Sequence, residues 1–320
     1  MGSSWYFDET TDDPGQSPLD NISFNGQLVN AVGRMIYAEK GVVYVDSDNE
    51  EEDLDTLDST CRGHGISVFS DPQNTTFQIV STRIHNEGKH VIYCVMVLRT
   101  DHVDTEKVMV ERRYSDFAAL YKAIKKDHPF LIKDVDFPGK VLFQKKNLNP
   151  ELIESRRIAF QAFLQTIYKY AEVRQHQAFK EFFYLPGLRE ATDNLKSGEL
   201  ENSLELFLNS LHLQVKLCDK GREIIATLGA IVDVLEAQGK LEDAERYATA
   251  ALELHVAQND YLCPHVIPLL DTVARLRWKL QMDKRTIERH LKHVQKMSGI
   301  ETDQAFTLRE LAVTRFDKEK

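Results

Sequence analysis

The second half of the sequence contains one block of residues twice, and this repeat constrains the fold of that region more than any other feature does. Residues 198–203 (GELENS) align with residues 239–244 (GKLEDA), and the two blocks start 41 residues apart. A repeat of this length is typical of helix pairs that stack on one another. We expect each glycine to end one helix, and the small residue of each block, Ser203 or Ala244, to let a partner helix approach closely. The sequence therefore predicts an all-α region of stacked helix pairs.

The second block resembles a tetratricopeptide repeat. Ala244, Ala248 and Ala251 occupy the small positions of that motif. The 41-residue spacing differs from the about 34 residues of that family, so the region is predicted to be tetratricopeptide-like. A third copy near Met282 is too altered to count as a repeat.

A different pattern precedes the repeat. Segments 76–84, 90–100 and 107–114 are rich in β-branched and aromatic residues and read as strands, with a turn signal at 86–88. Three strands in this order predict an antiparallel meander. Apolar residues at helical spacing then predict three helices, of which the last covers 174–183 and stops at Pro186-Gly187. The expected fold class is thus an α+β domain, a three-stranded antiparallel sheet plus helices, followed by an all-α domain.

Charge is distributed unevenly along the 320 residues, whose net charge is −10. Residues 1–76 contain 15 acids and 3 bases, whereas residues 77–185 contain 13 acids and 18 bases. The middle part therefore suits an anionic partner. The composition of residues 1–72, which include the acidic run 46–58, predicts a disordered acidic tail.

The sequence RRYSDF at 112–117 lies where the third predicted strand meets the first predicted helix. An isolated arginine pair at a strand end is usually solvated. Because side chains alternate along a strand, Arg112 and Arg113 are expected to point to opposite faces.

Two further basic residues favour a binding pocket. Arg156 falls inside an otherwise apolar helical stripe, where a charge needs a partner or a ligand, and Lys140 lies in a Pro-Gly loop. A pocket formed by Arg113, Arg156 and Lys140 suits a phosphorylated sugar, because arginine binds phosphate in bidentate fashion and lysine supplies a movable charge. Tyr114 would form an apolar wall under the sugar ring.

Residues 76–186 resemble a PX (phox-homology) domain of the sorting nexin family. The resemblance rests on the three strands, the Arg-Arg-Tyr-x-x-Phe motif, the Pro-x-Lys loop and the arginine before Phe-x-x-Phe-Leu. The chain departs from the family in this loop, where the usual proline-rich run is reduced to Pro138. The resemblance implies that phosphatidylinositol 3-phosphate is the ligand. It also implies that Arg113 binds the 3-phosphate and that Tyr114 stacks under the inositol ring. Lys140 would then contact the 1-phosphate, and Arg156 would bind the 4- and 5-hydroxyls.

The whole of residues 76–320 is similar to the small subgroup of sorting nexins in which a PX domain precedes a PX-associated helical (PXB) domain, the twenty and twenty-one types. The predicted division is a tail over 1–72, a PX domain over 73–186 and a helical domain over 187–320. The resemblance implies a peripheral protein of the early endosome membrane that recruits protein cargo or adaptors through its helical domain. A protein-interaction scaffold with weak or different phosphoinositide specificity is the alternative.

A loop beside the predicted pocket combines apolar and basic side chains. It reads Val141-Leu142-Phe143 and then contains Lys145 and Lys146. We expect this loop to contact the membrane, where each lysine near an anionic surface adds about 1 kcal/mol. The alternative is a loop that packs on its own domain.

Other functional classes find little support in the sequence. Motifs of the common hydrolase, metalloprotease, nucleotide-binding and dinucleotide-binding enzymes are missing, so we predict a non-enzymatic protein without a cofactor. His290 and His293 lack partners at metal-ligand spacing, the cysteines are too scattered for a zinc site, and no nucleic-acid-binding motif accompanies the basic segment. The run Val42-Val43-Tyr44-Val45 before the acids resembles a SUMO-interacting motif, with plain spacer as the alternative.

Overall fold

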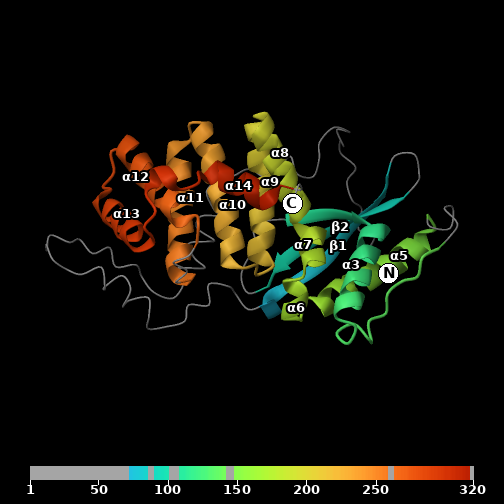
Figure 1. Ribbon diagram of the computed structural model, residues 1–320. Helices are drawn as coiled ribbons and strands as arrows, with labels where there is room; N and C mark the ends of the chain where they lie inside the picture. The colour runs from blue at the N-terminus through green and yellow to red at the C-terminus, as the bar shows by residue number, and fades with distance from the viewer. Residues whose placement is uncertain (1–71, 86–89, 101–107, 142–147, 259–262, 318–320) are drawn as a thin grey trace, which may run out of the picture.

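The structure of the chain, a computed structural model, describes residues 72–85, 90–100, 108–141, 148–258 and 263–317. A small sheet with its helices forms one end of the molecule, and a row of helices extends away from it (Figure 1). The elements at the sheet end are η1 (Pro72–Asn74), β1 (Thr75–Ile84), β2 (Val91–Arg99), β3 (Val108–Arg113), α3 (Tyr114–Asp127), α5 (Pro150–Ile167), α6 (Ala171–Arg174) and α7 (Gln177–Phe183). Those of the row are α8 (Leu185–Ser197), α9 (Leu200–Lys216), α10 (Gly221–Ala237), α11 (Leu241–Gln258), α12 (Val266–Lys279), α13 (Arg285–Ser298), η3 (Thr302–Gln304) and α14 (Leu308–Phe316).

The sheet confirms the predicted meander. Its strands lie in the order β1-β2-β3, both pairs are antiparallel, and a bulge interrupts β1 between Ile79 and Ser81. Helix α5 covers the outer edge of β1, where Gln165 and Gln161 accept hydrogen bonds from the backbone of Phe77 and Ile79, both at 3.2 Å. These amides satisfy backbone donors at the edge of the described sheet.

An aromatic cluster fixes α3 and α5 against the sheet. Phe117 of α3 stacks on Phe160 of α5 with ring centroids 4.0 Å apart, and Tyr93 of β2 meets Phe160 edge-on at 5.2 Å. All three side chains are fully buried. Since buried aromatic pairs of this kind contribute beyond their area alone, the cluster holds the start of α3 and the middle of α5 in a defined place.

The predicted helix over 174–183 ends at Phe183 as expected, but its start and its continuity are wrong. The chain forms two short helices there, α6 and α7, and then passes through Tyr184 alone into α8. Pro186 lies in the first turn of α8, where a missing backbone N–H costs nothing. The proline thus begins the next helix rather than ending the previous one, and the predicted domain boundary falls within this first turn.

The repeat ends its helices as predicted. Gly198 after α8 and Gly239 after α10 have φ values of 84° and 75°, and at each the N–H bonds to the carbonyl three residues before. The next N–H bonds to the carbonyl five residues before it, which completes a Schellman motif.

The third copy, which the sequence analysis rejected, exists in the structure. Gln281 after α12 has a φ of 59° and makes the same pair of backbone bonds, to Trp278 and, through Met282, to Arg277. Helices α12 and α13 therefore form a third pair. The copy is hidden in the sequence because glutamine occupies the left-handed position that glycine holds in the other two.

We expect Ala244→Leu to destabilise the chain by about 1–3 kcal/mol. Ala244 is fully buried in α11, the helix that pairs with α10, so extra methylene groups must displace packed neighbours. Urea denaturation of the full chain measures the effect, with Glu242→Leu on the exposed side of the same turn as the control. An unchanged unfolding midpoint for Ala244→Leu would contradict the repeat register.

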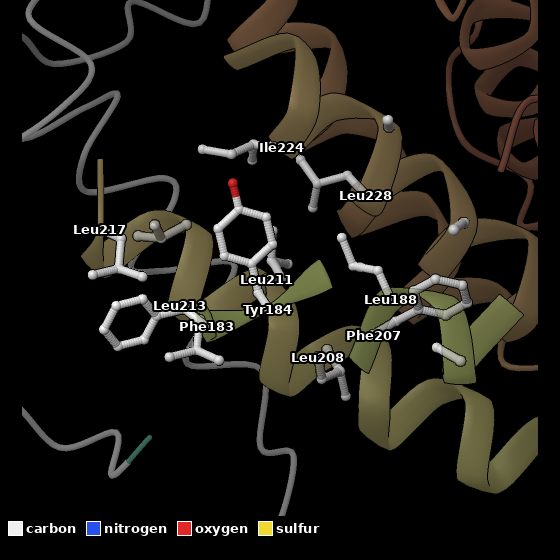
Figure 2. Close-up of a cluster of buried hydrophobic side chains, with 14 of the residues drawn as sticks. Phe183, Tyr184, Leu188, Phe207, Leu208, Leu211, Leu213, Leu217, Ile224 and Leu228 are labelled. Atoms are coloured by element: carbon white, nitrogen blue, oxygen red, sulfur yellow. The ribbon is translucent and has the colours of Figure 1, made fainter. Parts of the chain in front are cut away.

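The sheet end and the helical row share one hydrophobic core. Figure 2 shows Phe183 and Tyr184 lying among side chains of α9 and α10. Buried polar contacts reinforce the junction, because the Thr75 hydroxyl donates to the Lys216 carbonyl at 2.9 Å, and the Lys216 ammonium donates to the Val97 carbonyl at 3.3 Å. The end of α9 is thus bonded to both β1 and β2.

Candidate functional site

Arg113 stands at the junction of β3 and α3 and points away from the core. Its backbone N–H donates to Asp116 Oδ2 at 2.9 Å, which caps the start of α3. The side chain is 55% exposed, and its Nε lies 3.6 Å from Asp116 Oδ1. An exposed guanidinium with one surface carboxylate beside it remains open to a stronger anion, because such surface pairs contribute little.

Arg112 points to the opposite face, as predicted, but it is not a solvated residue. Its Nε and Nη2 donate to the backbone carbonyls of Phe182 and Phe183 at 2.6 and 3.3 Å, and the guanidinium lies 5.5 Å from the ring centroid of Phe182. Burial lowers the pKa of this arginine. Arg112 therefore attaches the end of β3 to α7 and has a structural role.

Tyr114 and Arg156 form one unit, as the sequence predicts. Arg156 is only 3% exposed, and its guanidinium carbon lies 4.2 Å from the centroid of the Tyr114 ring. Burial raises the pKa of the Tyr114 hydroxyl above its usual value, and the nearby guanidinium of Arg156 offsets part of this rise. A cation held against an aromatic face in this way is attracted to the ring.

Both side chains of this unit hold the loop that contains Lys140. The Tyr114 hydroxyl donates to the Pro138 carbonyl at 2.9 Å, and Arg156 Nη2 donates to the Gly139 carbonyl at 3.2 Å. Lys140 follows directly and is exposed. The structure thus fixes the backbone before Lys140 next to Tyr114 and Arg156, and leaves the ammonium facing solvent.

The sequence analysis missed two contributors to this site. The Phe137 ring stacks on the Tyr121 ring with centroids 4.4 Å apart, and its centroid lies 6.2 Å from that of Tyr114. Phe137 therefore anchors the loop to α3. Asp116 aligns Arg113 through the two contacts given above. The signal for Phe137 was its place before the Pro-Gly pair, where an aromatic residue can pin a loop.

Of the predicted membrane loop, the structure describes Val141 alone, which is half-buried. Leu142, Phe143, Lys145 and Lys146 lie outside the described residues, as does the run 42–45. Their roles stay predictions. Among the residues that the structure does describe, no cluster of His, Cys, Asp and Glu could hold a metal ion, and no helix is long and apolar enough to cross a membrane.

Comparison with known proteins gives this geometry a context. The family model of the PX domain matches residues 101–185. Sorting nexin-20 of Rattus norvegicus is 32% identical over 243 residues, which cover 75% of this chain and 76% of that protein. Sorting nexin-21 of Homo sapiens is 29% identical over 248 residues, covering 76% of this chain and 65% of the relative. A solved structure of a designed CISK-PX domain, 26% identical, covers 33% of this chain and 96% of its own, with a TM-score of 0.29.

The PX-domain match and the sorting nexin relatives place the chain in the class of PX-domain adaptors, peripheral proteins that act in membrane traffic. The helical row behind the PX domain and the matches along three quarters of the chain narrow this class further. The chain belongs to the sorting nexin family, in the subgroup of sorting nexin-20 and sorting nexin-21.

Proposed function

We propose that this chain binds phosphatidylinositol 3-phosphate on endosomal membranes through its PX domain and recruits protein cargo or adaptors through its helical domain. Arg113 binds the 3-phosphate, Tyr114 supports the inositol ring, Lys140 meets the 1-phosphate, and Arg156 reaches the 4- and 5-hydroxyls. The observation that supports this assignment best is the Tyr114–Arg156 contact of 4.2 Å, with both residues bonded to the loop before Lys140.

The arrangement suits a ligand with a phosphate at Arg113 and hydroxyl groups at Arg156. Arg156 is buried and already donates one bond to the Gly139 carbonyl, so it favours neutral acceptors in defined directions over a second mobile phosphate. Arg113 is exposed and charged, and arginine matches phosphate geometry in bidentate fashion. These different environments of Arg113 and Arg156 support a ligand with a 3-phosphate and free 4- and 5-hydroxyls.

Vesicle sedimentation of the full chain tests the lipid assignment. Neutral vesicles are compared with vesicles containing about 5% of phosphatidylinositol 3-phosphate, of the 4-phosphate or of the 4,5-bisphosphate. We expect strong binding to the first lipid and a several-fold lower affinity for the other two. Equal binding to all vesicles would overturn the assignment and favour an interaction scaffold with weak lipid contact. A preference for the 4,5-bisphosphate would assign Arg156 to a phosphate instead.

Deletion of residues 1–71 is expected to leave the affinity for these vesicles unchanged, or to raise it. Residues 1–71 contain 15 acids and 3 bases, so their removal takes a strongly negative segment away from an anionic surface. The same sedimentation series measures the affinity at about 0.05 and 0.3 M salt, and any gain should shrink at the higher salt. A large loss of binding on deletion would show that the segment supports the lipid site.

A further inference from the structure

Helix α13 presents four cations in one stripe to solvent. They occupy positions i, i+4, i+7 and i+11, which coincide on one face of a helix, and all four are exposed: Arg285, Arg289, Lys292 and Lys296. The opposite face packs on the core through Ile287, Leu291 and Val294. We call the four cations the basic stripe. Because the apolar face of α13 is already covered, the stripe is the free surface of this helix.

The basic stripe is not neutralised by the part of the chain that the structure describes. Neighbouring cations have carboxylate partners: Arg275 and Lys279 pair with Glu236, Arg277 with Glu245, and Lys284 with Glu288. Within the described ranges, no carboxylate lies at ion-pair distance from the four stripe residues. Like charges at these spacings destabilise a helix, so the stripe keeps an unfavourable charge density that an anionic partner would relieve.

Exposed apolar side chains occur on or next to the same two helices, α12 and α13. Met297 follows Lys296 directly and is 75% exposed, while Trp278 and Met282, at the end of α12, are 66% and 47% exposed. Helices α12 and α13 lie at the end of the row remote from the sheet (Figure 1). The surface therefore fits a segment in which apolar residues adjoin a run of acids.

We propose that the basic stripe binds the acidic segment 46–58 of this same chain. That segment contains eight acids and no base, and the apolar run Val42-Val43-Tyr44-Val45 directly precedes it. Its acids match the stripe in charge, and its apolar run matches the exposed apolar side chains of α12 and α13. Individual surface ion pairs are weak, but several acting together on a tethered segment benefit from a high effective concentration.

The connection between the acidic segment and the described chain is long enough for this contact. Residues 59–71 are 13 in number, and an extended chain of that length spans about 43–47 Å. Thr75, just after this connection, is bonded to Lys216 at the end of α9. From α9 to α13 the row advances by four helix-to-helix steps of about 8–10 Å, or about 32–40 Å in all.

A carbodiimide cross-linking experiment on the full chain tests the contact. This reagent joins lysine amines to carboxylates that already touch, and mass spectrometry identifies the pairs. We expect Lys292 and Lys296 to join acids of 46–58, with yields that fall roughly fivefold or more between 0.05 and 0.5 M salt, as screening requires. Lys220 and Lys240, which are exposed and lack a carboxylate partner in the described chain, serve as internal controls and should join those acids only at background level.

A charge-reversal pair sharpens the test. Arg285→Glu with Arg289→Glu keeps both reporter lysines and should lower their yield about tenfold, whereas the matched control, Lys220→Glu with Lys240→Glu, should not change it. The melting temperature of each variant confirms that the fold persists. Mixing light and heavy isotope-labelled chains separates contacts within one molecule from those between copies.

Three results would overturn the proposal. In the first, the acids of 46–58 are joined to Lys292 and Lys296 no more than to the control lysines. In the second, the joined pairs combine light and heavy chains, which assigns the stripe to a second copy. In the third case, the acids stay unlinked and the reversal pair lowers binding to phosphatidylserine vesicles without phosphoinositide, which makes the stripe a membrane contact. None of these readouts depends on the phosphoinositide assignment.

Discussion

Arg113→Gln is expected to weaken binding to vesicles containing phosphatidylinositol 3-phosphate by roughly 30-fold or more, with an unchanged melting temperature. A charge-assisted hydrogen bond to a phosphate contributes about 1.5–3 kcal/mol, and about 1.4 kcal/mol corresponds to a tenfold change in affinity. The Arg113 side chain is 55% exposed and has only the surface contact with Asp116. Its removal therefore affects the ligand far more than the fold.

Arg157→Gln is the matched control. Arg157 follows Arg156 on α5 and pairs with Glu154 at 2.7 Å, outside the proposed site. Its loss removes the same charge from the same domain, so a general electrostatic attraction would weaken equally in both variants. Equal losses of affinity for Arg113→Gln and Arg157→Gln would contradict a defined pocket and leave a diffuse basic surface.

The neighbouring variant Arg112→Gln is expected to affect the stability of the fold rather than the binding site. From the sequence, Arg112→Gln is expected to cost little affinity and to leave the fold intact, because alternation places Arg112 on the opposite face of the strand. The structure corrects this, since its guanidinium donates to the carbonyls of Phe182 and Phe183. Arg112→Gln is therefore a destabilising change whose loss of binding, if any, follows its loss of stability.

Local patterns predicted much of the sheet end of the molecule. The three strands appear within one residue of their predicted limits, because period-two alternation and turn residues are properties of short segments. Tyr114 and Arg156 also lie together as expected, since a lone arginine in an apolar stripe requires a partner. These signals need no knowledge of distant contacts.

Tertiary context decided what local patterns could not predict. Whether Pro186 ends one helix or begins the next depends on how α8 packs, and a proline permits both. Gln281 adopts the left-handed conformation between α12 and α13 although it is not a glycine, so glycine-based matching overlooks the third repeat. The role of Arg112 likewise depends on α7, some 70 residues further along the chain.

Asp219→Ala is expected to cost about 3–5 kcal/mol of unfolding free energy, the largest stability effect among the variants considered. Asp219 is 3% exposed and lies just after α9 at the junction of the two parts. Its Oδ2 accepts from the Tyr184 hydroxyl at 2.7 Å and from Gln214 Nε2 at 3.2 Å, and its Oδ1 lies 3.4 Å from Lys180 Nζ. Removing the carboxylate takes away these three contacts at once and leaves Lys180 with its longer contact of 3.9 Å to Glu223.

The partners of Asp219 cannot easily turn to water. Tyr184 is 3% exposed and Gln214 is fully buried, so both lose a hydrogen bond without replacement. Burial and the adjacent Asp219 carboxylate raise the pKa of the Tyr184 hydroxyl well above its usual range, which keeps it a donor at neutral pH. Asp219→Asn keeps an oxygen acceptor for this hydroxyl and should therefore cost less than Asp219→Ala.

Urea denaturation of the full chain measures the loss, with Asp193→Ala as the matched control. Asp193 is a carboxylate on α8 that is 64% exposed and has a single surface contact with Lys196 at 3.8 Å, so its removal should change stability by less than about 0.5 kcal/mol. Lys180 and Tyr184 belong to the sheet side of the junction, whereas Gln214 and Asp219 belong to the helical row. Loss of lipid binding and loss of helical signal should therefore occur at the same urea concentration in the wild type. An unfolding midpoint for Asp219→Ala no lower than that of Asp193→Ala would show that the two parts are not held together by this carboxylate.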